Sequence, residues 1–550
     1  MMCSEHCEAQ TQLNNALEEL AELKLKLEQA SQKLEQVTQE NAQTKMENSW
    51  LREQLRLKIQ REFGHSKDSN SDQLALFHFN EAEQLASPAA EEPTLTPSAS
   101  ALPKTPRKRK PSRERKDLWE NLPVQRTVHT IPEGERACPH CGEERRKITE
   151  EVSRRLGVIP ARFYVEEVVR EVFVCDGCQE IGEHAPITTA EAPEPPIKKS
   201  IASASLLAYI ADLKYCDGLP LYRIEKMLKR MDLSISRQNL ANWMICISDM
   251  WLKPLYDELH NILLTKDILH SDATVLQVLK EPGRSAQTQS SMWVYNTGRS
   301  DAENSIVLFE YQQTKEAKWP KEFLRGFSGY LHVDGAPTYD AAKLLNVILI
   351  GCLSHARRGF VNALKVAPKG SKTWGTHAHR GQEFCDMLFD LEREYDKLKL
   401  SPEERAAERE LYSRVVLDAF YEWLVTERPN VQTQSYTGKA MDYCLKQWTK
   451  LSNFMLDGRL ECSNNAAERC IKPFVMARKC FLFSNTPSGA NASAILFSIV
   501  ETAKANNLKP YDYLKWLLEQ LPNIRLTSSE LQQLLPWSPH LPSECRLSQN

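Results

Sequence analysis

Residues 266–279 read KDILHSDATVLQVL and decide the fold, because they open a series of five short runs rich in branched and aromatic side chains. The other four runs are SMWVYNTG at 291–298, SIVLFEYQ at 305–312, GYLHVDGA at 329–336 and NVILIGCL at 346–353. Such runs are typical of β-strands. Helix-like sequence precedes the fourth run and follows the fifth. Three antiparallel strands followed by alternating helices and strands predict a ribonuclease-H-like α/β domain, in which ligands bind at strand ends.

Three acidic residues of this domain are candidate metal ligands. Asp272 lies in the first strand, and Asp334 ends the fourth. These strands are neighbours in the predicted topology, and two adjacent carboxylates repel each other unless a hard cation such as Mg²⁺ lies between them. Glu468, in the first turns of a helix that we expect to begin after an Asn cap, completes a site for two metal ions that could promote phosphodiester displacement. The alternative is that lone Asp residues at strand ends only form caps and turns.

Two groups of basic residues are candidate contacts to DNA phosphates. One follows Glu468 and comprises Arg469, Lys472, Arg478 and Lys479. The other lies in KTPRKRKPSRERK at 104–116 and includes Arg107, Lys108, Arg109 and Lys110. A dense basic block suits binding to phosphates with counterion release. The second group closes a flexible linker, 63–117, rich in Ser, Pro and Ala, for which a solvated tether is the alternative interpretation.

The segment 1–62 is predicted to form a coiled-coil helix. Its apolar seam includes Leu20, Leu23, Leu27 and Leu34, which follow one another at steps of three, four and seven residues. No Gly or Pro interrupts the chain between residues 13 and 59. This seam would pair copies of the chain into a homodimer or a higher assembly. A single amphipathic helix packed on its own chain is the alternative.

Two C-x-x-C pairs, CPHC and CDGC, place Cys138, Cys141, Cys175 and Cys178 in a small domain at 118–190. Four thiolates at this spacing fit a closed structural Zn²⁺ site, against the alternative of unpaired buried thiols. The next segment, 191–265, reads as successive helices. Ser234 or Ser236 is expected to cap the helix that carries Arg237 and Trp243. This segment is compatible with helix-turn-helix DNA binding and equally with an ordinary helical bundle.

The catalytic domain is assigned to residues 266–484 and includes a helical insertion at about 367–456, dense in Glu, Arg, Leu and Lys. The insertion would contact DNA or another subunit, or serve as a scaffold. A C-terminal helical segment at 485–525 and a tail at 526–550 follow. His355, Arg357 and Arg358 begin a helix beside the sheet, where contact with phosphate competes with packing and capping as an explanation.

The composition fits a large soluble protein of several domains, since 550 residues exceed the size of a single core. The net charge of −3 hides the local basic groups. The 15 cysteines are too scattered for a disulfide framework. Neither a secretory signal nor an apolar run of membrane-spanning length is present, so we expect a cytoplasmic protein without membrane contact.

The ordered blocks of this chain resemble those of transposases of the insertion-sequence family sixty-six. The blocks are REFGHSKDS, CPHCG with VCDGC, YCDGLPLYRIEKML, SRQNLANWM, HSDATVLQVL, YLHVDGAPTYD, GCLSHARRGF, GRLECSNNAAERCIKPFVMARKCFLF and SIVETAKANNLKPYDYLKWLLEQLP. The resemblance implies that Asp272, Asp334 and Glu468 are the catalytic acids and that Mg²⁺ or Mn²⁺ is the cofactor. It also implies that the double-stranded DNA of element ends and target is the substrate, and that accessory proteins are encoded nearby. Ala273, Ala336 and Ser463 depart from the family pattern without removing a predicted ligand.

These features predict a DNA transposase that cleaves at insertion-sequence ends and joins them to target DNA. A catalytically inactive repressor that binds element ends is the first alternative, since the cysteine pairs and basic linker serve both functions. A stand-alone nuclease of the same fold is the second. The acidic triad separates the enzymes from the repressor.

Overall fold

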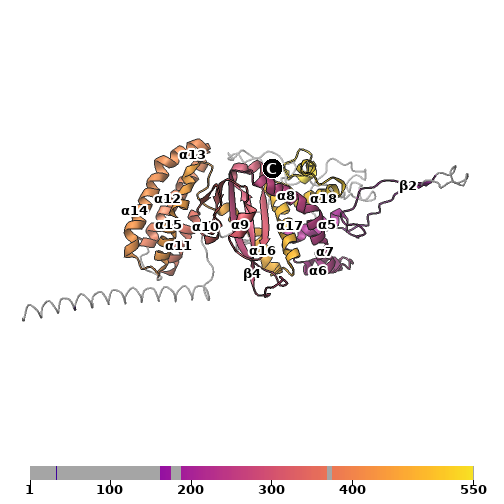
Figure 1. The fold of residues 1–550 in the computed structure, drawn as a ribbon, viewed down its shortest axis with the longest axis horizontal. Helices are drawn as coiled ribbons and strands as arrows, with labels where there is room; N and C mark the ends of the chain where they lie inside the picture. Colours follow the sequence, from indigo (N-terminus) through magenta and orange to yellow (C-terminus); the bar gives the residue numbers. More distant parts are fainter. Residues whose placement is uncertain (1–32, 34–161, 175–186, 368–373, 549–550) are drawn as a thin grey trace, which may run out of the picture. The chain divides into compact units, whose positions relative to one another are not determined.

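The computed structural model describes Lys33 and residues 162–174, 187–367 and 374–548. The chain divides into two compact units. In one, strand β1 (Val172–Val174) pairs antiparallel with β2 (Ile187–Thr189). The other contains residues 191–547, with the main sheet and the helices discussed below (Figure 1). Apart from Lys33, the predicted coil lies outside the described residues, as do the basic linker and the four zinc cysteines.

The main sheet has five strands, which fall on the five runs that the sequence singled out. They are β3 (Ile268–Gln277), β4 (Gln289–Thr297), β5 (Val307–Gln312), β6 (Gly329–His332) and β7 (Val347–Ile350). Their order in space is β5-β4-β3-β6-β7. The first three strands are antiparallel, and β6 and β7 run parallel to β3. β4 is buried along nearly its whole length, as expected for a strand covered on both faces.

Side chains and backbone from other elements bond to backbone groups at both edges of this sheet. At the β5 edge, the amides of Val307 and Phe309 donate to the hydroxyls of Thr502 (3.0 Å) and Ser498 (2.7 Å) on helix α17 (Pro487–Ala505). At the β7 edge, the Asn453 side chain donates to the Leu349 carbonyl (2.9 Å). The Gly351 amide beside it donates to the Lys450 carbonyl (2.8 Å). Edge groups that would otherwise be open to another strand are therefore occupied.

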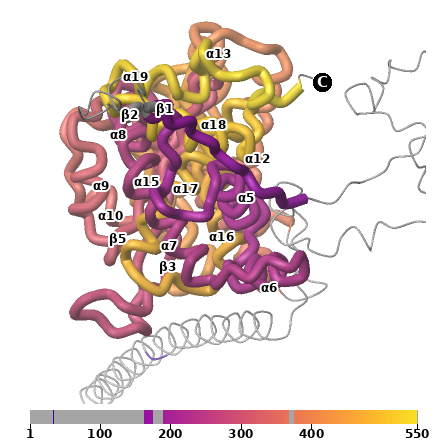
Figure 2. The backbone as a smooth tube through the Cα atoms, turned by 90° about the vertical axis from the view of Figure 1, so that its right-hand side faces the viewer, coloured from indigo at the N-terminus to yellow at the C-terminus, as the bar shows by residue number. Residues whose placement is uncertain are grey.

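Helices from both ends of the described chain share one core. The first are α5 (Ala204–Tyr215), α6 (Leu221–Arg230), α7 (Arg237–Ile247), a π-turn (Ser248–Leu252) and α8 (Lys253–Leu263); the last are α17, α18 (Pro510–Gln520) and α19 (Ser528–Gln532). The Ser236 hydroxyl caps α7 by accepting from the Asn239 amide (3.3 Å), as predicted. Tyr215 packs edge-on against Phe497, with ring centroids 5.0 Å apart. Figure 2 shows α5, α16 and α17 as neighbours. α17 is buried nearly all around and so forms the centre of this layer.

The connections beyond β5 bring a second helical layer to the sheet. Helices α9 (Lys318–Phe323), α10 (Pro337–Ala342) and α11 (Leu353–Val366) follow β5, β6 and β7 respectively. Between α11 and α16 (Asn465–Phe481) lie α12 (His377–Leu398), α13 (Pro402–Glu408), a π-turn (Arg409–Ser413), α14 (Arg414–Glu427) and α15 (Tyr436–Ser452). These are the helices of the predicted insertion (Figure 1). Stacked Phe384 and Phe420, with ring centroids 5.0 Å apart, lie at their centre.

A buried ion pair ties the insertion to the chain that leads into α16. Arg409 is fully buried and donates through Nε and Nη2 to the two carboxylate oxygens of Glu392, at 2.7 and 2.8 Å. Its other bonds go to the backbone carbonyls of Phe454 (2.7 Å), Asp457 (2.9 Å) and Leu460 (2.8 Å). Five hydrogen bonds use all five donors of the guanidinium.

Among the helices that the structure describes, none has the combination of length and apolar sequence needed to cross a membrane.

Candidate active site

Asp272 and Asp334 come side by side through the pairing of their strands. Asp272 lies in the middle of β3, and Asp334 follows the end of β6 by two residues. The parallel register aligns His270 with His332. Because side chains two residues apart point to the same face of a strand, the two Asp residues continue this alignment. Both are half-buried.

The turn after β6 holds Asp334 in place. Its Oδ1 accepts a hydrogen bond from the Ala336 amide (3.0 Å). A Cβ atom at Gly335 would lie 2.9 Å from the Tyr443 hydroxyl and closer still to the Tyr443 ring. Tyr443 belongs to α15, so a helix of the insertion packs directly on the turn that carries Asp334. Only glycine permits so close an approach at this position.

Glu468 lies in the first turn of α16, where its carboxylate is half-buried. Nη2 of Arg358 is 3.4 Å from each of its oxygens, and Nδ1 of His355 is 3.7 Å from Oε1. His355 and Arg358 come from the first turns of α11, which directly follows β7. The short sequence SHARRGF therefore brings two nitrogen-bearing side chains to the third acid.

The electrostatics of Asp272 show that the three acids converge. The pKa of Asp272 is raised to about 7, mainly because burial disfavours the charged carboxylate. The negative charges of Asp334 and Glu468 raise this pKa further, whereas a hydrogen bond from the Ala273 amide (2.7 Å) and the charge of Lys315 lower it. Residues separated by up to 196 positions in the sequence are thus close enough to disfavour ionisation of the same group (468 − 272).

This group of acids fits a hard divalent cation. Carboxylate oxygens are the donors that Mg²⁺ and Mn²⁺ prefer. The charges of Asp334 and Glu468 oppose ionisation of the buried Asp272, and a bound cation would offset that effect. Asp272, Asp334 and Glu468 are the residues that would hold it.

A second set of ligand atoms shares Glu468. Sγ of Cys352, a nitrogen of His355 and an oxygen of Glu468 all lie within 4.8 Å of one another. The Cys352 thiol is fully buried, accepts from the Asn464 amide (3.2 Å), and has its pKa raised to about 11 by burial. A protonated, soft sulfur donor suits a hard cation poorly. We therefore assign Cys352 to packing, and His355 and Arg358 to the surroundings of Glu468.

Asn464 occupies the N-cap position of α16, where the sequence predicts an Asn cap, but its side chain makes no capping bond. Instead, its amide donates to the Ser271 carbonyl of β3 (2.8 Å), and its Oδ1 lies 3.1 Å from Nδ1 of His270. Asn464 thus fixes the start of α16 to the strand that carries Asp272. The sequence could not indicate this because its partners lie more than 190 residues away.

The predicted basic residues after Glu468 follow one helix but differ in environment. Arg469 and Lys479 are exposed, whereas Lys472 and Arg478 are half-buried. Arg478 turns to β3, where it donates to Thr274 Oγ1 (2.9 Å) and to the Val275 carbonyl. The predicted contacts Arg107, Lys108, Arg109 and Lys110 lie outside the described residues. So do the zinc ligands Cys138, Cys141, Cys175 and Cys178.

Comparison with known proteins defines the class as transposase. Residues 199–492 match the model of the transposase IS66 family, so the chain belongs to that family. Residues 498–537 match the IS66 C-terminal element. Residues 135–179, which include all four predicted zinc cysteines, match the zinc-finger binding domain of transposase IS66. Residues 50–127 match a model described as the transposase C of IS166 homeodomain. These matches support DNA binding and a structural zinc.

Three relatives come from Sinorhizobium fredii (strain NBRC 101917 / NGR234). The uncharacterized protein y4qI is 30% identical over 426 residues, which cover 75% of each chain. The uncharacterized protein y4jD is 29% identical over 413 residues, 73% of this chain and 78% of that one. The uncharacterized protein y4hP is 26% identical over 503 residues, 88% of this chain and 87% of that one. The similarity therefore extends over most of each protein.

Proposed function

We propose that this transposase cleaves DNA at the ends of an insertion sequence and joins the ends to target DNA by metal-dependent phosphoryl transfer. The observation that carries the proposal is the convergence of Asp272, Asp334 and Glu468 at one end of the sheet. The strand order and directions also support a ribonuclease-H-like catalytic domain. In such a domain, acids from the first strand, the fourth strand and a later helix meet at the ligand-binding end.

The three acids would hold two Mg²⁺ or Mn²⁺ ions, which when bound stabilise the attacking and leaving oxygens of an in-line displacement. In the first step, a water oxygen bonds to the scissile phosphorus and the bond to the 3′ oxygen breaks, leaving a 3′ hydroxyl. In the second, that hydroxyl attacks a phosphodiester of the target and displaces another 3′ oxygen. Each step replaces one P–O bond with another, so neither consumes a nucleotide cofactor or an oxidant.

Neighbouring side chains would orient this chemistry. Arg358 contacts both oxygens of Glu468 and limits the rotation of its carboxylate. Asn464 fixes the helix of Glu468 to the strand of Asp272. The exposed Arg469 and Lys479 lie on the same helix, where they suit DNA phosphates. Preorganisation of this kind lowers the barrier because reacting groups need not be ordered at each turnover.

The rest of the chain would supply recognition and assembly. We propose that the zinc-finger domain, the basic linker and helices α5–α8 bind the element ends. The predicted coil at 1–62 would pair two or more copies, and accessory proteins encoded nearby would assist in the cytoplasm. What supports these roles is the family membership together with the sequence patterns described above.

Replacing Asp334 by Asn tests the proposal. Cleavage of a duplex carrying the DNA that flanks this gene should fall at least about 1,000-fold, equivalent to about 4 kcal/mol, while binding to that duplex is retained. Asp418→Asn, on the exposed face of α14, is the matched control and should cut as the wild type does. The readouts are strand cleavage in vitro and insertion of a marked mini-element in cells.

The outcomes separate the alternatives. Undiminished cutting by Asp334→Asn would refute the assignment of the acids. End binding without cutting by the wild type would favour the repressor. Cutting by the wild type without joining would favour a stand-alone nuclease.

A further inference from the structure

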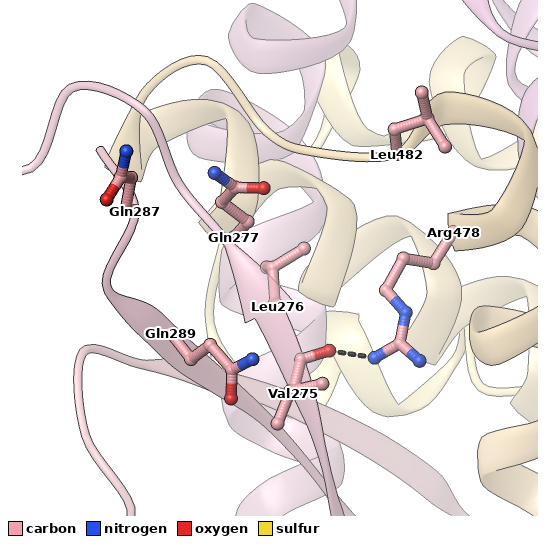
Figure 3. Close-up of a pocket in the computed structure, with 7 residues that line it drawn as sticks. All are labelled: Val275, Leu276, Gln277, Gln287, Gln289, Arg478 and Leu482. Carbon is pink, nitrogen blue, oxygen red and sulfur yellow. Dashed lines mark hydrogen bonds between the residues drawn. The ribbon is translucent and has the colours of Figure 1, made fainter.

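A small pocket lies where β3, the start of β4 and the end of α16 meet (Figure 3). Its volume is about 340 Å³, and it is lined by Val275, Leu276, Gln277, Gln287, Gln289, Arg478 and Leu482. This volume is at the lower end of the range of small-ligand sites, roughly 300–1,000 Å³. Val275 follows Asp272 by three residues on the same strand, a path of about 10 Å. Side chains three residues apart leave opposite faces of a strand, so the pocket lies beside the strand of Asp272 and not on the face of that acid.

The cationic side of this pocket is Arg478. Burial lowers the pKa of its guanidinium. Its hydrogen bonds go to Thr274 Oγ1 and the Val275 carbonyl, both neutral acceptors and both reached from Nη1. No carboxylate forms an ion pair with it in the part of the chain that the structure describes. Because a half-buried cation without a counter-charge is costly, an incoming anion such as a DNA phosphate would stabilise this arrangement.

The rest of the lining is apolar or carries neutral amides. Leu276 is buried, whereas Val275 and Leu482 are 39% and 65% exposed and present aliphatic surface to the solvent. Gln277 donates to the Ala286 carbonyl (2.7 Å), which braces the hairpin between β3 and β4. Gln287 and Gln289 are exposed. In Figure 3, the Gln289 amide and the Arg478 guanidinium extend towards Val275. Amides can both donate to and accept from the edge of a nucleobase, and aliphatic surfaces suit its faces.

Leu482 is held over this pocket in a strained conformation. Its φ is +68° and its ψ is −49°, and the Phe483 amide donates to the Phe481 carbonyl (2.9 Å). This is a three-residue γ-turn of the rare, strained hand. α16 fixes the turn on one side. On the other, Ser484 exchanges backbone hydrogen bonds with Gln277 (2.9 Å) and Leu279 (3.0 Å). Strain kept by surrounding structure is typical of ligand-binding positions.

We propose that this pocket receives one unstacked nucleobase of the element-end DNA. Leu482 and Val275 would contact its faces, Gln287 and Gln289 its edge, and Arg478 an adjacent phosphate. The inference rests on the proposed function, since DNA bound at the acids is what brings a base to this place. Unstacking costs least near a strand end or a distorted step, which is the state of DNA at a cleavage junction.

The test measures binding without catalysis. The full chain carrying Asp334→Asn, which retains its zinc, is titrated in buffer without added Mg²⁺ or Mn²⁺ and without a chelator. The ligands are fluorescent duplexes of the flanking DNA in which one nucleotide at a time is abasic. We expect one position within about three nucleotides of the cleaved phosphate to weaken binding about 10-fold, in line with the loss of one base contact. Adding Leu482→Gly or Gln289→Ala should weaken binding of the intact duplex similarly but add no loss on that abasic duplex.

The choice of variants separates loss of the pocket contact from misfolding or a general loss of DNA binding. Leu482→Gly suits a positive φ, so it removes the aliphatic contact without adding backbone strain. Gln533→Ala changes an exposed glutamine outside the pocket and should affect neither duplex. Equal weakening on intact and abasic duplexes, or no sensitive position at all, would overturn the inference. Since nothing is cut in this assay, failure of the cleavage chemistry would leave its result unchanged.

Discussion

Two arginines of this chain differ in the hydrogen bonds and ion pairs that they form. The difference distinguishes a residue that holds the fold together from one that would bind a ligand. Arg409, in the insertion, is fully buried and uses five donors on Glu392 and three backbone carbonyls. Arg478, at the end of α16, is half-buried and bonds to two neutral acceptors from one nitrogen. A charge satisfied within the chain needs no partner, whereas an unsatisfied one is stabilised by a ligand of opposite charge.

The acids show the same contrast. Glu392 forms ion pairs with both Arg409 and Arg405. Asp272, close to two other carboxylates, receives one amide hydrogen bond and the more distant charge of Lys315. The buried charges of Arg409 and Glu392 are therefore paired within the chain, whereas the half-buried Asp272 has no ion pair among the described residues. This comparison identifies the region where a cation and DNA would contribute most to stability.

Replacing Arg409 by Met should have the largest effect on stability. It leaves Glu392 buried beside Arg405 alone and orphans three carbonyls, which should cost about 3–5 kcal/mol. The measurement is the shift in the urea unfolding midpoint of the full chain. Arg393→Met, which removes an exposed ion pair with Asp390, is the control and should change stability by less than about 1 kcal/mol. Equal shifts for the two variants would break the comparison.

Glu310 offers a pH-dependent test of an unsatisfied charge away from the acids. Burial raises its pKa from 4.5 to about 7, although hydrogen bonding by Gln312 (2.7 Å to Oε1) and by the Tyr295 hydroxyl lowers it. The folded chain therefore holds this proton more tightly than the unfolded chain. The carboxyl costs nothing below about pH 4.5, costs progressively more as the pH rises to about 7, and costs its full amount above that.

Glu310→Gln should consequently stabilise the protein by about 2–3 kcal/mol at pH 8.5 and by much less at pH 5.5. Thermal unfolding midpoints of variant and wild type across this range give the measurement. Glu303→Gln, at an exposed position, is the control. A stabilisation that does not grow with pH would contradict the argument.

Asn464→Ala should have a smaller effect, on catalysis more than on binding. Loss of its bonds to Ser271 and His270 loosens the start of α16 relative to β3, so cleavage should fall about 10- to 100-fold, or roughly 1.4–2.7 kcal/mol. More Mg²⁺ should be needed for half-maximal cleavage, while the affinity for the element-end duplex should change little.

The exposed Asn491 on α17 provides the matched control, since Asn491→Ala removes the same side chain away from the acids. An unchanged Mg²⁺ requirement in Asn464→Ala, with activity lost only through unfolding, would reduce Asn464 to a packing residue.

Local pattern predicted much of the sheet. Branched and aromatic runs mark all five strands, because such residues suit a pleated, buried surface. The cap of α7 at Ser236 was also readable, since a helix N-cap depends on neighbours three residues away. Asp272, Asp334 and Glu468 could be selected by position in the expected topology. Their assignment as metal ligands stays a prediction, which the influence of Asp334 and Glu468 on the pKa of Asp272 supports.

What the sequence could not indicate are polar side chains whose partners lie far along the chain. The sequence predicts Asn464 as a helix cap and gives no signal at Ser498 or Thr502. Each of the three bonds to a strand residue that lies 189–195 positions away in the sequence. His355 and Arg358 were equally compatible with packing. A side chain's local preference says nothing about a distant acceptor, so these ties follow only from the assembled fold.

The bonds to the edge strands of the sheet affect how copies of this chain could associate. Hydroxyls of α17 occupy the backbone of β5, and residues of the insertion occupy that of β7. Open strand edges favour pairing between the sheets of neighbouring copies. To pair with these backbone groups, another copy would have to displace α17 or residues of the insertion. The contacts made by α17 and by the insertion therefore protect these edge positions from pairing with the sheet of another copy.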